Sequence, residues 1–270
     1  MKRIYLLLLV LWALGTGQAW ACTGFVISSG DPDTVIAAKN EDYRDPDTVM
    51  EFVQPMDGTM GYVLFGYADS DIAPQGGMNQ AGLVFDSFTV DEGDNIHTVE
   101  TRNSICRKIL SSCATVEEAR EILKGDRSYL EYDQWLISDA SGNAILVDHK
   151  APPYDKVTSS MVVTNFRYSD IETERKKCLR FQIAERMLRK DQTPSVENAR
   201  RILSATHEDL DSPTQYSVIY EPAHARFHLY YFHNFEEELV IDLKNIQLYN
   251  KKIPIPDLFH DNFAAYYYNL

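Results

Sequence analysis

Apolar and polar residues alternate along much of the chain, which is the pattern of strands with one buried face. In the first third beyond position 21 the alternation predicts strands at 23–27, 34–38, 49–54, 61–67 and 82–89. A polar turn at 28–33 joins the first two strands into a hairpin, and Lys39-Asn40-Glu41-Asp42 ends the second of them. The glycine pair in 76–79 predicts a turn before the last strand.

Helical spacing follows. Residues 102–112 carry apolar side chains at Ile105, Ile109 and Leu110, and Thr115 with Glu118 forms a capping box for a helix ending near 123. Further helices are predicted at 173–189 and from Thr193-Pro194 onward. Strands recur at 134–138, 144–148, 161–165, 215–220, 226–232 and 237–242. The order predicts an α+β fold with a mostly antiparallel sheet and segregated helices, and two sheets with helices outside would fit it.

The first 21 residues have the pattern of a secretion signal. Lys2 and Arg3 precede an apolar run at 4–14, and Ala19 and Ala21 fit the small-residue cleavage rule. This run is shorter than the roughly 20 residues needed to span a bilayer, and no later stretch reaches that length. We therefore expect export to the periplasm or beyond, with residues 1–21 removed and 22–270 forming one domain. A retained anchor, or a lipid on the cysteine at position 22, are the alternatives.

The net charge limits the classes of partner, and the cysteine spacing limits the possible disulfides. The chain carries a net charge of −14, which argues against nucleic acid or an anionic membrane as partners. An even number of cysteines in an exported protein suggests disulfides, but Cys106 and Cys113 would lie about 10 Å apart along one helix and could not pair. A bridge from either to Cys178 stays open. A bridge to Cys22 is the alternative that would remove the chemistry described next.

Cys22 would become the first residue of the mature chain. A cysteine in that place carries a thiol, with an ordinary pKa of about 8.5, and an α-amine, with a pKa of about 8. One residue then supplies both the attacking atom and the proton acceptor. The sequence therefore predicts amide or ester hydrolysis.

Other polar residues at strand ends are candidates to assist Cys22. Asp42 closes the first hairpin, so its carboxylate could hold an amine or thiol proton. Asn79 and Asn165 could donate to an oxyanion, although an isolated asparagine is more often a turn former. His224 and His228 have a metal-like spacing, but in a strand they would stand about 13 Å apart, and no Cys or carboxylate completes a ligand set, so no metal is expected. No cofactor is expected either, because Gly76-Gly77 lacks the context of a phosphate-binding loop.

Several segments, taken together, resemble the choloylglycine hydrolase family of N-terminal-nucleophile (Ntn) hydrolases, which includes bile salt hydrolases and penicillin V acylases. The similar segments run in order over nearly the whole of 22–270. They are Cys22-Thr23-Gly24-Phe25, Lys39-Asn40-Glu41-Asp42, the turn at 77–83, the helix at 115–123, the hairpin at 135–147, Val163-Thr164-Asn165, Leu179-Arg180-Phe181 and Thr214-Gln215-Tyr216-Ser217.

The resemblance implies an αββα four-layer sandwich and hydrolysis of non-peptide C–N bonds in a small linear N-acyl amide. It makes Cys22 the nucleophile and its amine the base, with Asp42 orienting that amine. It places Asn165 and a backbone N–H near Thr89 in the oxyanion hole, and Arg180 near the nucleophile.

Three departures from the family pattern concern substrate and assembly. Lys39 replaces the family's arginine and keeps only its charge. Glu41 replaces a usually apolar residue, so both positions are expected to bear on substrate binding. Arg180 follows Asn165 by only 15 positions. The family's longer insert is absent there, which weakens the case for bile-salt specificity and for the family tetramer, and leaves Arg175 as a rival for the arginine role.

Two other functions fit the same fold. The chain could be a secreted or lipid-anchored binding protein that has lost turnover, which the substitutions at 39 and 41 would favour. It could instead transfer its acyl group to another amine rather than to water. The sequence identifies neither the acyl group nor the amine of the substrate.

Overall fold

A computed structural model describes residues 22–31, 34–69, 74–90, 96–156, 158–245 and 250–268. Within them the strands form two sheets whose neighbouring strands are antiparallel. The six-stranded sheet has the order β10 (Ser160–Thr164), β1 (Thr23–Ser28), β2 (Val35–Asp42), β11 (Thr214–Glu221), β12 (Arg226–Tyr231), β13 (Asn234–Asp242). The eight-stranded sheet has the order β14 (Lys251–Pro254), β3 (Thr48–Val53), β4 (Tyr62–Tyr67), β5 (Gly76–Asn79), β6 (Val84–Thr89), β7 (Asp133–Ser138), β8 (Ala144–Val147), β9 (Tyr154–Asp155).

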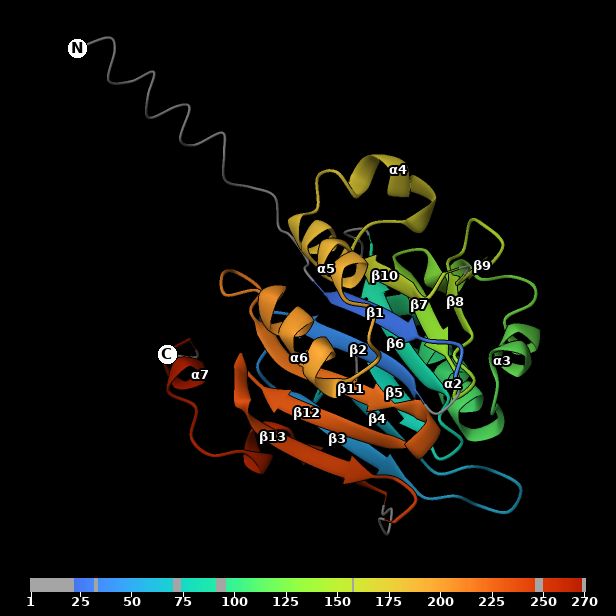
Figure 1. Ribbon diagram of the computed structural model, residues 1–270. Coiled ribbons are helices and arrows are strands. Elements are labelled where there is room, and N and C mark those ends of the chain that lie inside the picture. Colours follow the sequence, from blue (N-terminus) through green and yellow to red (C-terminus); the bar gives the residue numbers. More distant parts are fainter. Residues whose placement is uncertain are drawn as a thin grey trace.

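The two sheets face each other and helices cover their outer faces (Figure 1). Helices α5 (Leu179–Lys190) and α6 (Val196–Ala205) pack on the six-stranded sheet. Helices α2 (Ile96–Ser112) and α3 (Val116–Ile122) pack on the eight-stranded sheet. A third apolar cluster fills the space between the sheets. The predicted αββα four-layer architecture is therefore confirmed.

Short helices complete the description: η2 (Ser128–Leu130), η3 (Tyr168–Asp170), α4 (Ile171–Glu174), η4 (Pro222–His224), η5 (Pro256–Leu258) and α7 (Phe263–Tyr268). Among the described residues, the helices all fall short of the length and apolarity needed to cross a membrane. The predicted signal, 1–21, lies outside the described residues.

Local chemistry explains the helices that were correctly predicted. The Thr115 side chain accepts from the Glu118 amide and the Glu118 carboxylate accepts from the Thr115 amide, so the capping box that starts α3 is confirmed. Helix α5 buries Phe181, Ala184 and Leu188 at helical spacing against the sheet.

The turn predicted at 76–79 is wrong, because these residues form strand β5 between β4 and β6. The glycines serve close packing instead. A Cβ on Gly77 would lie 2.4 Å from the Val63 carbonyl oxygen, and one on Gly76 would lie 2.5 Å from Asp86 Oδ1. The turn comes just afterwards, at Gly82, whose φ is +83°.

Other boundaries also differ. Strand β2 continues through Asp42 instead of ending before Lys39. The helix predicted over 173–189 is two helices separated at 175–178, and the next helix is capped by Ser195 rather than Thr193. Asn79 is buried and caps α2, donating to the carbonyl oxygens of Leu110 at 2.9 Å and Cys113 at 2.7 Å. The strand β14 and the helix α7 were not predicted, because their short apolar runs have no clear period.

All four cysteines are free thiols. Helix α2 is continuous through Cys106, as the argument against a Cys106–Cys113 bridge assumed. Cys178 belongs to the apolar cluster under α5, whereas Cys106 and Cys113 lie in the cluster on the far side of the other sheet. Cys22 is therefore unbridged.

Candidate active site

Strand register gathers the candidate residues at one end of the six-stranded sheet. Thr23 of β1 pairs with Thr164 of β10 on one side and with Asn40 of β2 on the other. One residue earlier, Cys22 therefore stands between Asn165 and Glu41. Residues far apart in sequence meet there because antiparallel neighbours bring the start of one strand beside the end of the next.

The Cys22 thiol points into the space between the sheets. Its Sγ lies 3.8 Å from Glu41 Oε2 and 3.9 Å from the Asp42 carbonyl oxygen. Glu41 Oε2 also pairs with Lys39 Nζ at 2.6 Å. Burial, and then the Glu41 carboxylate, raise the pKa of the Cys22 thiol well above its ordinary value. The thiol is therefore protonated at neutral pH in this chain, in which its nitrogen is part of a peptide bond.

Lys39 is fully engaged inside the protein. Its ammonium donates to the Gln75 carbonyl oxygen at 2.9 Å and to that of Ser87 at 2.6 Å, besides pairing with Glu41. An ammonium has three hydrogens, so these partners use all of them. Burial alone would lower the pKa of Lys39, but the Glu41 carboxylate raises it above its ordinary value. These contacts hold the Lys39 ammonium inside the protein beside Glu41.

A buried polar cluster surrounds this ion pair. The Tyr67 hydroxyl donates to Glu41 Oε1 at 2.9 Å, and the Tyr220 hydroxyl lies 3.4 Å from Asp86 Oδ1. Burial raises the pKa of Asp86 to about 8, although Lys39 opposes this rise. Below that pH a neutral Asp86 leaves the Lys39–Glu41 pair electrically balanced between the sheets.

Asp42 faces the opposite way, toward the helices, because side chains alternate along a strand. Its carboxylate accepts from the Thr214 hydroxyl and lies 3.4 Å from Arg180 Nη1. Arg180 also approaches Glu208 Oε2 at 3.7 Å. Burial raises the pKa of Asp42, and Arg180 opposes the rise. The Asp42 atom within hydrogen-bonding distance of the Cys22 thiol is therefore its carbonyl oxygen.

The structure distinguishes the two candidate arginines. Arg180, in the first turn of α5, reaches Asp42. Arg175 lies at the end of α4 and pairs with Glu172 at 3.3 Å and Glu185 at 3.9 Å on the surface. Arg180 is therefore the arginine at the candidate site.

Asn165 and Thr89 also come together, but through the Thr89 carbonyl oxygen and not through the backbone N–H that the family resemblance implied. Asn165 Nδ2 donates to the Thr89 carbonyl oxygen at 2.8 Å, across from one sheet to the other. The Thr89 hydroxyl donates to Asp133 Oδ1 at 3.1 Å, and Asp133 in turn pairs with Arg102. A carboxamide nitrogen has two hydrogens, and Thr89 uses one of them. The other has no partner among the described residues.

Five residues of the site were not predicted as such from the sequence, Thr214 having been named only within a family-like segment: Tyr67, Asp86, Asp133, Glu208 and Thr214. Tyr67 and Asp86 occupy inward positions of buried strands. A polar group at a position where the strand alternation predicts a core residue was therefore the signal in the sequence. Glu208 and Thr214 flank a turn and carry no period of their own.

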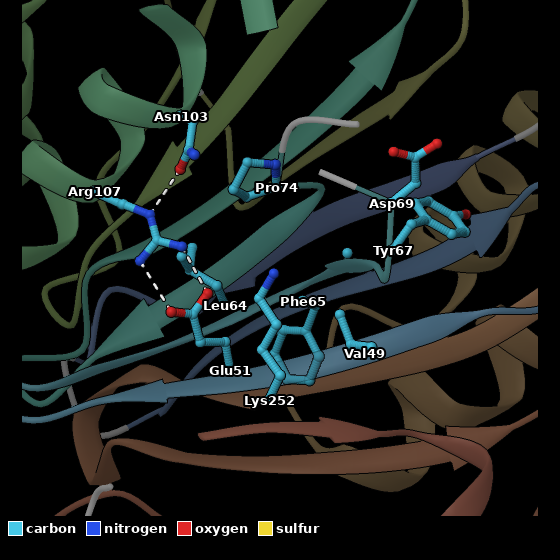
Figure 2. A pocket seen from close by; sticks show the side chains of 11 residues that line it. Val49, Glu51, Leu64, Phe65, Tyr67, Asp69, Pro74, Asn103, Arg107 and Lys252 are labelled. Atoms are coloured by element: carbon cyan, nitrogen blue, oxygen red, sulfur yellow. Dashed lines mark hydrogen bonds and ion pairs between the residues drawn. The ribbon is translucent and has the colours of Figure 1, made fainter. Parts of the chain in front are cut away.

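A pocket of about 100 Å³ lies over β3, β4 and α2 (Figure 2). Arg107 in this pocket makes two bonds to Glu51, at 3.3 and 2.6 Å, and a third to Asn103. Its positive charge is thus already paired. Tyr67 lines the pocket and also donates a hydrogen bond to Glu41. Tyr67 therefore connects this pocket with the candidate site.

The histidine spacing considered in the sequence does not form a strand pair. His224 lies in η4, before β12 begins, so the expected strand geometry is wrong there. His228 Nε2 lies 2.8 Å from Glu221 Oε2 and its Nδ1 lies 3.1 Å from Glu238 Oε1. Carboxylates therefore flank His228, which the sequence had not indicated.

Comparison with solved structures supports the fold. A mutant conjugated bile acid hydrolase from Clostridium perfringens aligns with a TM-score of 0.64 at 15% identity, over 86% of this chain and 96% of that one. Penicillin V acylase from Agrobacterium tumefaciens aligns at 0.61 and 15%, over 83% and 87%. A Caenorhabditis elegans N-acylethanolamine-hydrolyzing acid amidase ortholog aligns at 0.57 and 17%, over 75% and 93%.

These structures match the resemblance predicted from the motifs, and at such identities they show the fold. No curated protein sequence matches the chain. The family model for acyl-coenzyme A:6-aminopenicillanic acid acyl-transferase matches residues 29–231, a segment that includes Asp42, Asn165 and Arg180 and begins after Cys22. The chain therefore belongs to the acyl-coenzyme A:6-aminopenicillanic acid acyl-transferase family.

Proposed function

We propose that the mature protein begins at Cys22 and is a cysteine amidase that hydrolyses the C–N bond of a small linear N-acyl amide. The observation that carries this proposal is the register that places Cys22 between Asn165 and the end of β2. The relatives of similar fold are described as a bile acid hydrolase, a penicillin V acylase and an acid amidase. Their chemistry supports amide cleavage without identifying the substrate.

The chemistry divides among the described residues. The Cys22 thiol gives its proton to the α-amine and attacks the substrate carbonyl carbon. The second N–H of Asn165, held in direction by the Thr89 carbonyl, stabilises the oxyanion. The C–N bond breaks as the amine leaves with a proton, and water then hydrolyses the thioester. Neither a metal nor a cofactor enters these steps.

Removal of residues 1–21 is the proposed switch. In the 270-residue chain the Cys22 nitrogen is a peptide nitrogen and cannot accept a proton, and burial keeps the thiol protonated. Cleavage creates an amine with a pKa of about 8 beside that thiol. Export with signal removal would then generate the active protein without a separate propeptide.

Glu41 and Lys39 are proposed to hold the thiol rather than the substrate. Glu41 Oε2 accepts from the Cys22 thiol at 3.8 Å, and Lys39 and Tyr67 fix that carboxylate from two sides. Arg180 and Thr214 similarly fix Asp42, whose proposed role is to orient the new amine.

The direct experiment compares the mature chain with its Cys22→Ser and Cys22→Ala variants, after mass spectrometry confirms the first residue. Amine release is measured on bile-acid, phenoxyacetyl and fatty-acyl amides and on acyl-homoserine lactones. We expect a loss of at least about 100-fold for both variants. The matched control is Cys113→Ala, a thiol in the apolar cluster under α2 and α3, which should retain activity. Full activity in Cys22→Ala would exclude the thiol mechanism.

Acyl transfer is a second candidate, favoured by the description of the matching family model. It shares the thioester and differs in whether an amine or water accepts the acyl group. Adding 6-aminopenicillanic acid to the reaction and measuring the ratio of acylated amine to free acid separates the two. A ratio that rises with the amine until free acid disappears would establish transfer, and free acid alone would establish hydrolysis.

A further inference from the structure

A second cluster of reactive side chains lies beside the candidate active site but outside its chemistry. His207 and Asp209 follow α6, and His233 lies in the turn between β12 and β13. His207 Nε2 is 2.9 Å from Asp209 Oδ1, and His233 Nδ1 is 3.2 Å from the same oxygen. One ligand atom from each residue falls within 4.8 Å of the others.

The hydrogen bond on the far side of His207 fixes which nitrogen faces the cluster. Its Nδ1 lies 2.6 Å from the Ser204 carbonyl oxygen, and because a carbonyl only accepts, Nδ1 carries the hydrogen. Nε2 is then the nitrogen that faces Asp209 Oδ1 at 2.9 Å, and either a proton or a metal ion must lie between these two atoms. Such a backbone-oriented imidazole is the arrangement typical of metal-ligating histidines.

From this geometry we propose that His207, Asp209 and His233 bind a divalent transition-metal ion of the zinc type. Ligands about 2.0–2.1 Å from a tetrahedral zinc ion lie roughly 3.3 Å from one another. The spacings of 2.9 and 3.2 Å are close to that value. Two imidazoles and one carboxylate suit zinc better than calcium or magnesium, which prefer oxygen. A fourth position would be left for water.

The position explains what a bound ion would do. Glu208 lies between His207 and Asp209 in the sequence, and its carboxylate approaches Arg180. The backbone amide of Glu208 donates to the Thr214 hydroxyl at 2.9 Å. Thr214 in turn binds Asp42. A metal ion would therefore tie the segment after α6 to the β12–β13 turn and hold these contacts to Asp42. The Asp209 side chain is 66% exposed, so the ion can enter from solvent.

Zinc uptake by the full chain is the test, with free zinc set by a competing chromophoric chelator. We expect the wild-type chain to bind one zinc ion. The zinc affinity should fall at least about tenfold in His207→Ala, His233→Ala and Asp209→Asn. The control is His260→Ala, which removes an exposed histidine that pairs with Glu237. Zinc should also raise the melting temperature of the wild type and the control but not of the three variants.

Cobalt substitution keeps the test decisive where a variant folds poorly. Co²⁺ bound to the wild-type chain should give the visible absorption of four-coordinate nitrogen and oxygen ligation, without thiolate charge-transfer bands, and EDTA should abolish it. Equal zinc affinity in the wild type and in the His207→Ala/His233→Ala double variant would overturn the proposal. So would cobalt spectra dominated by thiolate, because the cysteines would then be the ligands.

Discussion

At the residue scale, buried charges beside Cys22 compensate one another. Lys39 and Glu41 are 1% and 3% exposed and 2.6 Å apart. Glu41→Gln leaves Lys39 charged without its partner, so we expect a loss of about 3–5 kcal/mol in the free energy of unfolding, measured with urea. Lys124→Ala breaks an exposed pair with Glu121 and should cost under about 1 kcal/mol. Similar losses for the two variants would contradict the buried pair.

Asp86 gives the pH prediction at the same scale. Its pKa rises from 3.8 to about 8 on folding, so the folded state keeps a proton that the unfolded state releases. Stability from this group is therefore complete below about pH 4 and is lost as the pH rises to about 8, by up to about 1.4 kcal/mol per unit. Asp86→Asn should reduce the slope of the unfolding free energy against pH, between about pH 4 and pH 8, by the contribution of one proton. An unchanged slope would show that Asp86 is already ionised in the folded protein.

At the element scale, Asn40 joins β2 to the end of α6. Its Nδ2 donates to the Leu203 carbonyl oxygen at 2.9 Å, and its Oδ1 accepts from Ser217 at 2.7 Å. Asn40→Ala leaves buried groups unpaired, and we expect a cost of about 1–3 kcal/mol, measured by thermal and urea unfolding. Asn143→Ala, in an exposed turn, is the matched control and should cost under about 0.5 kcal/mol. A neutral Asn40→Ala would mean that α6 is held by its apolar face alone.

Some of the secondary-structure elements could be predicted from the sequence and others could not. Strong periods, such as the α5 stripe and the Thr115 capping box, predicted their elements correctly. Strand β5 was missed because its glycines, chosen for contact with Val63 and Asp86, look locally like a turn. Close approach between strands is a tertiary property that no local pattern contains.

The candidate site divides in the same way. Cys22, Asp42, Asn165 and Arg180 lie at the ends of predictable elements, so motif spacing indicated them. The directions of the Glu41 and Asp42 side chains were not predictable, because they depend on where β2 ends. Since β2 runs through Asp42, Glu41 and not Asp42 turns toward the thiol.

At the scale of the whole molecule, the proposed switch is Cys22, the first residue of the mature chain. Both sheets and the surrounding contacts are already in place while the Cys22 nitrogen is still a peptide nitrogen. Activation then requires only a new amine and no rearrangement of the fold. A chain with Cys22 first and one with Ala21 first should therefore have melting temperatures within a few degrees of each other.

The most direct measurement compares the activity of those two chains, each verified by mass spectrometry, on the same N-acyl amide panel. The chain beginning at Cys22 should release amine, and the chain that retains Ala21 should be at least about 100-fold slower, because its Cys22 nitrogen cannot accept the thiol proton. Equal rates for the two chains would contradict the central claim that the N-terminal amine of Cys22 is the catalytic base.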